Sequence, residues 1–225
     1  EVYNLGFNGA NTSEVLTLLE TALAHATPDV VTICSAFNNL YGSTLTDLRP
    51  SAAPFHRRAL LGRSLLYTTL YRAWTAWELR TATFEVVLRR YQRDLKEIAH
   101  LSRVHGFKLV FILQPMATSD SVAWEAMGEQ WNDSGEGLAG LRLQIDAASK
   151  TQPRMLQEMS DIALQQGVHV VDPRAAFHGN HKEFFAVFLH LSPAGSRALA
   201  KSIVDHLAGL PGGLRDFFAP STTEQ

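Results

Sequence analysis

The sequence predicts an α/β domain built around a parallel β-sheet. Four short runs rich in β-branched and aromatic residues are separated by stretches with helical periodicity, and two of those stretches end in a glycine before the next run. The chain of 225 residues is 46% hydrophobic, which suffices for one domain with a sizeable core. Strands that alternate with helices in this way favour parallel pairing. The expected strands are Val2–Leu5, Val30–Cys34, Leu109–Leu113 and Val168–Val171.

The first helix is expected between the first two strands. It covers Glu14–Glu20 behind the possible caps Thr12 and Ser13, and Pro28 closes the segment before the second strand. The second strand ends in Cys34, and a single cysteine excludes a disulfide within this chain. Its place in an apolar run favours a buried strand residue over a nucleophile.

Two longer helices complete two further crossovers. Phe84–His105 is followed by Gly106, and Met155–Gln166 is followed by Gly167, so that each helix has a C-terminal stop before the next strand. The apolar residues of the first of these helices recur at helical spacing. They are Val87, Leu88, Tyr91, Leu95, Ile98 and Leu101.

Two insertions are expected to overhang the ligand edge of the sheet. One contains the loop Arg49–Pro54 and an aromatic-rich helix at Leu60–Leu79, and the other is the polar stretch Thr118–Gly140, which is predicted to be a loop. Residues 1–210 are predicted to form a single domain, and residues 211–225 a peripheral tail.

Composition narrows the classes of partner. The formal net charge is −2, with acidic and basic residues interleaved, which leaves no electrostatic footprint for nucleic acid. No apolar run reaches the roughly 18 residues of a membrane span, and the first residues lack the pattern of a signal peptide. No histidine spacing indicates a metal site, and no cofactor is expected. We expect a small-molecule partner, and the sequence leaves the cellular compartment open.

Candidate chemistry lies after the strands, because ligands of an open parallel sheet bind beyond the carboxyl ends of its strands. The turn Asn4–Thr12 contains two glycines ahead of a helix, so its exposed N–H groups could hold an oxyanion, or could serve the turn alone. Asn38 follows the second strand, where its amide could donate to developing negative charge or cap a turn. His190 precedes a helix capped by Ser192 and opened by Pro193, and is either a general base or an ordinary loop histidine.

The set and order of these pieces resembles the SGNH (GDSL-type) hydrolase family over nearly the whole chain. The most specific match is the run His-Leu-Ser-Pro-Ala-Gly from His190, and the next is the Asn4–Thr12 turn. The resemblance implies a flavodoxin-like, three-layer α/β/α sandwich. It also implies that Gly9 and Asn38 form the oxyanion hole and that His190 is the catalytic base.

The sequence departs from the family pattern at three positions. Ala36 and Asn39 replace the usual Gly and Asp around Asn38, and Val187 stands three residues before His190, where the family has the triad aspartate. Valine cannot accept the Nδ1–H of the imidazole. A working site would therefore need another acceptor, such as a backbone carbonyl, a water, or the carboxylate of Glu183 or Asp172.

The family also carries its catalytic serine in a Gly-Asp-Ser block upstream of the turn that starts here at Asn4. We expect that block, and the first, central strand of the sheet, to be missing from the printed sequence. Unpaired backbone and exposed apolar surface should then remain beside the first two expected strands. Asp133-Ser134-Gly135 echoes the block, but no strand precedes it, so Ser134 is interpreted as structural.

The resemblance implies an ester hydrolase, of esterase, lipase-like or deacetylase type, which acts on a small-molecule ester by serine acyl transfer when the upstream serine is present. The alternatives are a catalytically inactive binding module of the same fold and an acyltransferase. By itself the printed chain is not expected to hydrolyse esters efficiently. Aromatic residues of the first insertion could line the acyl site or belong to the core; they are Tyr67, Tyr71, Trp74 and Trp77.

Overall fold

The computed structural model describes most of the α/β domain. The described residues are 2–4, 10–40, 84–116, 135–177, 181–185, 190–211 and 213–218. Several predictions fall outside these ranges. They concern the loop Arg49–Pro54, the helix at Leu60–Leu79 with its four aromatic residues, and Ser134.

Three parallel strands form the sheet of the described structure. They are β1 (Val30–Ile33), β2 (Lys108–Ile112) and β3 (His169–Val171), in the order β1-β2-β3. Val31 lies opposite Leu109, and Phe111 lies opposite Val170. The predicted parallel pairing is confirmed.

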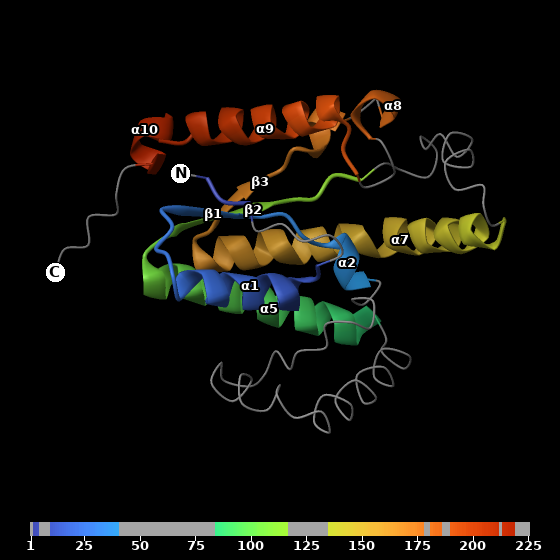
Figure 1. Ribbon diagram of the computed structural model, residues 1–225, viewed down its shortest axis with the longest axis horizontal. Helices are drawn as coiled ribbons and strands as arrows, with labels where there is room; N and C mark the ends of the chain where they lie inside the picture. Colours follow the sequence, from blue (N-terminus) through green and yellow to red (C-terminus); the bar gives the residue numbers. More distant parts are fainter. Residues whose placement is uncertain are drawn as a thin grey trace, which may run out of the picture.

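Helices cover both faces of this sheet (Figure 1). On one face lie α1 (Thr12–Leu23), α5 (Phe84–His105) and α7 (Gly135–Gln166), and on the other lie α9 (Pro193–Ala208) and α10 (Gly213–Phe218). The connections contain the short helices α2 (Phe37–Leu40), η1 (Arg174–Phe177) and α8 (His181–Phe184). The arrangement is the three-layer α/β/α sandwich that the resemblance implies.

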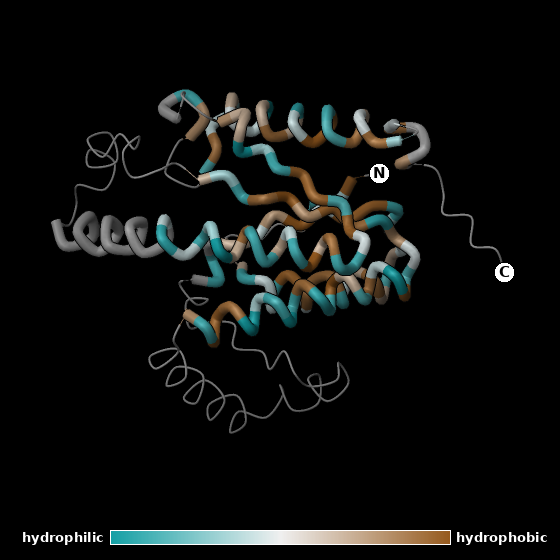
Figure 2. Tube along the Cα trace, turned by 180° about the vertical axis from the view of Figure 1, so that it is seen from behind, coloured by the Kyte–Doolittle hydropathy of each residue, from teal (hydrophilic) through white to brown (hydrophobic). Residues whose placement is uncertain are grey.

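Alternating residues of β2 supply the two cores on either side of the sheet. Leu109 and Phe111 pack into the cluster formed with α1, α5 and α7, whereas Val110 and Ile112 pack against α9 and α10. All four side chains are buried, and each such burial stabilises the fold by roughly 1.5–3 kcal/mol. Figure 2 shows the resulting pattern, with hydrophobic colour in the strands and alternating colours along α9.

The local signals at helix ends are largely confirmed. Helix α5 has the predicted bounds, and Gly106 and Gly167 follow α5 and α7 with φ of 75° and 67°, a conformation that costs glycine no Cβ clash. The cap of α1 differs from the prediction, since Asn11 rather than Thr12 or Ser13 is the N-cap and forms a capping box with Glu14. The hydroxyl groups of Thr12 and Ser13 bind another helix, as described below.

Helix α7 is longer than predicted. It begins at Gly135, inside the stretch 118–140 that was expected to be a loop, and it continues through Pro153. An internal proline removes one helical hydrogen bond and costs about 3 kcal/mol. The burial of five side chains just after Pro153 offsets this cost: Met155, Leu156, Met159, Ile162 and Ala163.

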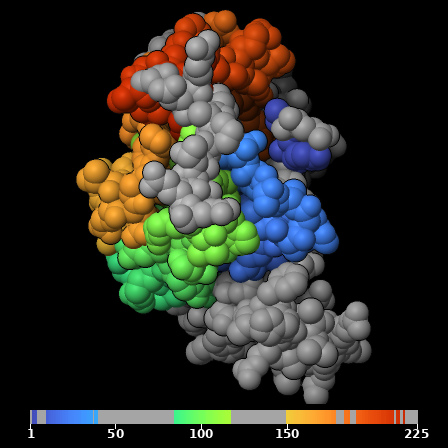
Figure 3. Space-filling view, turned by 90° about the vertical axis from the view of Figure 1, so that its left-hand side faces the viewer, coloured from blue at the N-terminus to red at the C-terminus, as the bar shows by residue number. Residues whose placement is uncertain are grey.

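The expected first strand does not form in residues 2–4, which have no regular secondary structure. Val2 and Tyr3 are 96% and 70% exposed, and Figure 3 shows this dark-blue segment at the surface. A strand needs a neighbouring backbone to satisfy its N–H and C=O groups, and in the described part of the sheet β1 pairs with β2 alone. The strand predicted for Val2–Leu5 is therefore not confirmed in the part of it that the structure describes.

The described part of the expected tail packs on the sheet. Phe217 of α10 is buried, its ring lies 5.3 Å from that of His169, and its carbonyl oxygen accepts a hydrogen bond from Lys108 Nζ. Residues 213–218 thus pack against the domain, and the boundary at residue 210 stays a prediction. Within the described ranges, none of the helices combines the length and apolarity needed to cross a bilayer.

Candidate active site

Residues from three connections meet the carboxyl end of the sheet. Helix α2 follows β1 there, α1 begins there at Thr12, and the loop with His190 leads into α9 at the same end of the sheet (Figure 1). This edge is where an open parallel sheet binds its ligands.

Asn38 of α2 contacts the turn that precedes α1. Its side-chain Nδ2 donates a 3.1 Å hydrogen bond to the carbonyl oxygen of Ala10. Gly9, the other expected oxyanion donor, lies outside the described residues but is bonded to Ala10. The turn before α2 is held from the neighbouring strand end, because the N–H of Ala36 donates to Gln114 Oε1 at 3.1 Å. Asn38 therefore sits in a turn that is fixed from two sides.

His190 is exposed on the loop before α9, and the residues that follow it contact the C-terminal end of α8. The N–H of Ser192 donates to the carbonyl oxygen of Phe184 at 2.9 Å, and Leu191 forms an antiparallel bridge with Phe185. Ser192 also caps α9, as predicted, by accepting from the N–H of Gly195 at 3.0 Å. The loop geometry that presents the imidazole is thus set by backbone contacts.

Gly195 is required for this anchoring. A Cβ at this position would lie 2.0 Å from the carbonyl oxygen of Phe184, closer than any real Cβ contact. Glycine in the His-Leu-Ser-Pro-Ala-Gly run therefore allows α9 to approach α8. The glycine of this run, besides matching the family pattern, is therefore required by the packing of α9 against α8.

No acid is found beside the imidazole in the part of the chain that the structure describes. His190 makes no hydrogen bond or ion pair with another described residue, and Val187 lies outside the described ranges. Asp172 forms an ion pair with Arg174 at 2.6 Å, and the hydrogen bond between them raises the pKa of Arg174. Glu183 is exposed, and its carbonyl oxygen accepts from the hydroxyl of Ser192. The structure thus brings Asn38 to Ala10, just before α1, and among the described residues no contact joins Asn38 to His190.

Cys34 differs from its prediction. It lies one residue beyond β1 and is exposed rather than buried. Although its surface is accessible, desolvation by the surrounding protein raises the pKa of its thiol to about 12, which argues against a nucleophile. Among the described residues, no group of three or more His, Cys, Asp or Glu side chains is placed to hold a metal ion.

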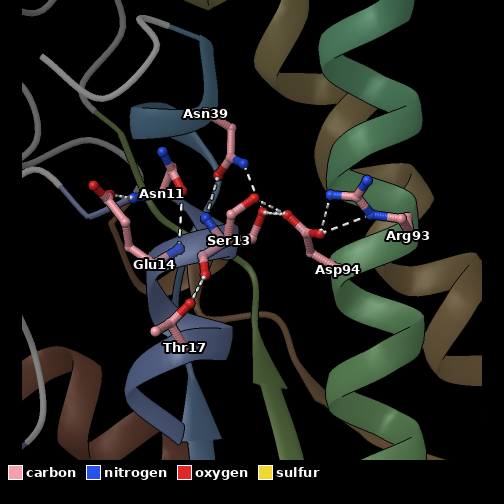
Figure 4. Close-up of polar contacts among 8 residues, drawn as sticks. Asn11, Ser13, Glu14, Thr17, Asn39, Arg93 and Asp94 are labelled. Atoms are coloured by element: carbon pink, nitrogen blue, oxygen red, sulfur yellow. Dashed lines mark hydrogen bonds and ion pairs between the residues drawn. The ribbon is translucent and has the colours of Figure 1, made fainter. Parts of the chain in front are cut away.

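A buried polar cluster next to α2 was not predicted from the sequence. Asp94 of α5 is fully buried and accepts hydrogen bonds from Thr12 Oγ1 at 3.2 Å and from Ser13 Oγ, while Arg93 forms an ion pair with it at 2.9 Å (Figure 4). Thr12 is also bound by Asn39. The signal was available, because Asp94 stands three residues after Tyr91 and four before Ile98, on the apolar stripe of the helix.

Comparisons with known proteins identify the fold. No protein-family model and no curated protein matches the sequence. Among solved structures, the acetylxylan esterase Axe2 from Geobacillus stearothermophilus is similar with a TM-score of 0.53 and 16% identity, over 94% of this chain and 74% of its own. A GDSL-like lipase from Bacteroides thetaiotaomicron is similar with a TM-score of 0.51 and 10% identity, over 87% of this chain and 69% of its own. This chain therefore has the fold of the SGNH (GDSL-type) hydrolases.

Proposed function

We propose that the protein is an ester hydrolase that works by serine acyl transfer, with Asn38 and Gly9 as oxyanion donors and His190 as general base. The observation that carries the proposal is the hydrogen bond from Asn38 Nδ2 to Ala10 O. It supports the proposal because it holds the Asn38 amide beside Ala10, the residue that follows Gly9 in sequence, at the ligand edge of the sheet. Two donors aimed at one point are what a tetrahedral oxyanion requires.

In the proposed reaction the serine attacks the ester carbonyl while His190 takes its proton, and the carbonyl oxygen gains negative charge. The N–H of Gly9 and the amide of Asn38 stabilise that charge. His190 then returns the proton to the leaving alcohol, and water releases the acid from the acyl-enzyme by the same steps in reverse. The nucleophile is the serine that the resemblance places upstream of Asn4.

Acetyl esters are the substrates to test first. The esterase that shares the fold is named for acetylxylan, and the fold alone does not fix the substrate of this chain. A short acyl group makes the smallest demand on the acyl site, so p-nitrophenyl acetate reports the chemistry before substrate preference matters. Acetylated xylo-oligosaccharides then test a carbohydrate substrate.

A catalytically inactive binding module of the same fold is the second candidate. It is favoured by the surroundings of His190, which has no carboxylate partner in the described part of the chain, and by the ion pair that engages Asp172 with Arg174. An imidazole without an orienting acceptor loses most of its value as a base.

The two candidates differ in turnover. Hydrolysis of p-nitrophenyl acetate is measured with two proteins: the printed chain, and the same chain extended by any residues that precede Glu1 in its gene. The His190→Ala variant of each protein is measured as the control. Turnover by the longer protein that His190→Ala abolishes supports the hydrolase. The absence of turnover in the longer protein, with a folded circular dichroism spectrum, would contradict the hydrolase and leave the binding module.

A further inference from the structure

We infer that Asp94 and Thr12 are positioning residues for the oxyanion site, linked to Asn38 through Asn39. This inference rests on the proposed function, because it assigns a purpose to the geometry of Asn38. It concerns residues to which the family pattern gives no role. They come from helices α5 and α1, and Thr12 contacts Asn39 of α2 (Figure 4).

The starting point is a carboxylate with no access to water. Asp94 is 0% exposed, whereas its partner Arg93 keeps half of its side chain exposed. Arg93 Nε and Nη2 both donate to Asp94 Oδ1, at 3.2 and 2.9 Å, and the hydroxyls of Thr12 and Ser13 donate to Oδ2. A buried charge is tolerated when it is paired and hydrogen-bonded in this way. A hydrophobic side chain at this position would avoid the free-energy cost of desolvating a carboxylate. A local requirement for a hydrogen-bond acceptor therefore explains Asp94 better than a contribution to stability does.

The carboxylate of Asp94 determines the direction of the hydrogen bond between Thr12 and Asn39. An ion-paired carboxylate accepts only, so the single hydroxyl hydrogen of Thr12 is directed toward Asp94. The Oγ1 of Thr12 is then left as the acceptor for Asn39 Nδ2, at 2.7 Å. In return Asn39 Oδ1 accepts from the N–H of Thr12 at 3.3 Å and from Ser35 Oγ at 3.4 Å. The amide of Asn39 therefore has one orientation that satisfies all its partners.

This orientation fixes the neighbouring amide. Asn39 ties α2 to the first residue of α1, and Asn38, one position earlier, spans the same gap by donating to Ala10 O. Loss of the Asn39 contact with α1 would let the start of α2 shift, and the amide of Asn38 would then move relative to Ala10. A displacement of about 1 Å is enough to weaken catalysis strongly. The cluster thus fixes the position of the Asn38 amide, one of the two proposed oxyanion donors, relative to Ala10 and the start of α1.

Nuclear magnetic resonance tests the link on the printed chain, whether or not that chain hydrolyses esters. The side-chain amide signals of Asn38 and Asn39 are assigned by their loss in Asn38→Asp and Asn39→Asp. Thr12→Val removes the hydroxyl and keeps the shape, and we expect it to shift both pairs of signals and to speed the hydrogen exchange of the Asn38 amide about tenfold. Thr12→Ser should restore the wild-type signals.

Two control variants change the same chemistry elsewhere. Thr21→Val removes a hydroxyl that bonds within α1, to Thr17 O, and should leave the Asn38 signals unchanged. Asp94→Asn replaces the acceptor and should reproduce Thr12→Val, whereas Asp161→Asn, on the exposed side of α7, should not. Unchanged Asn38 signals in a folded Thr12→Val protein would overturn the inference. Failure of both Thr12→Val and Asp94→Asn to fold would overturn it too, in favour of a role in folding alone.

An activity measurement separates this inference from the proposed function. In a form that hydrolyses p-nitrophenyl acetate, Thr12→Val should lower kcat about tenfold at unchanged KM, less than the roughly 10²–10³-fold loss when an oxyanion donor itself is removed. Thr12→Ser should recover kcat. If no form hydrolyses esters, the proposed function fails, and the resonance experiment still decides whether Asp94 and Thr12 position Asn38. A loss confined to KM would contradict positioning of an oxyanion donor.

Discussion

Asn38 and Ala10, which lie on separate connections of the sheet, are joined by a hydrogen bond from Asn38 Nδ2 to Ala10 O. A carboxamide nitrogen carries two hydrogens. One is used by Ala10, and the second is the one that an oxyanion would need. The contact therefore holds the amide at the ligand edge and leaves one of its two N–H hydrogens available to an oxyanion.

Replacing Asn38 by alanine should lower kcat for p-nitrophenyl acetate by about 10²–10³-fold in the active form of the protein, because one preorganised donor to the oxyanion is lost. Gln165→Ala, at an exposed position of α7, is the matched control and should keep wild-type kcat. Steady-state kinetics check both variants. A loss in Asn38→Ala no greater than in Gln165→Ala would remove Asn38 from the mechanism.

Replacing Val187 by aspartate should increase ester hydrolysis in the same protein. An aspartate three residues before His190 restores the acceptor that orients the imidazole and stabilises its charged form. The rise should appear in kcat and should require His190, so Val187→Asp combined with His190→Ala is the control and should be inactive. An unchanged kcat in Val187→Asp would mean that another group already orients His190.

Replacing Gly195 by alanine should lower the free energy of unfolding by ~1–3 kcal/mol, since the added Cβ forces α9 away from α8. The Cβ would lie 2.0 Å from Phe184 O, a backbone atom that cannot rotate aside. Gly209→Ala is the control, because its Cβ would stay 3.5 Å from its neighbours and its φ of −80° suits alanine; its effect should stay below ~1 kcal/mol. Urea unfolding measures both. Equal effects would show that Gly195 is not a close-packing position.

Acidification should weaken the contact between β3 and α10. Partial burial lowers the pKa of His169, and so do the nearby charges of His206 and Lys108. The unfolded chain then binds a proton more readily than the folded chain, so the free energy of unfolding should fall as the pH drops below about 6.5, the ordinary value for histidine. His169→Gln should flatten this dependence between pH 8 and pH 5, whereas His100→Gln, exposed on α5, should not. A wild-type pH profile in His169→Gln would contradict the assignment to His169.

Local sequence signals predicted those elements whose ends are decided by the chain itself. The bounds of α5, the stops at Gly106 and Gly167 and the cap at Ser192 follow from backbone conformation and from contacts between residues close in sequence. The strands β1, β2 and β3 lie within the predicted runs or one residue from them. These features need no knowledge of distant partners, which is why they could be predicted.

Elements that depend on distant partners could not be predicted in the same way. The hydroxyl of Thr12, predicted as a possible cap, instead donates to Asp94, 82 residues away, and Asn11 caps α1. Residues 2–4 have strand-like composition but no strand, because a strand exists only in a ladder. Helix α7 continues through Pro153 because the burial of its later turns outweighs the lost hydrogen bond.

The sequence by itself determined the α/β class, the resemblance to a hydrolase family and the three candidate residues Gly9, Asn38 and His190. Only the tertiary structure decided that Asn38 reaches the Ala10 carbonyl, that Asp172 is engaged by Arg174, and that a buried carboxylate lies beneath the site. The physical reason is that residue type limits the chemistry a side chain can perform. Which hydrogen-bond or ion-pair partner a side chain finds depends on packing between segments that are far apart in the chain.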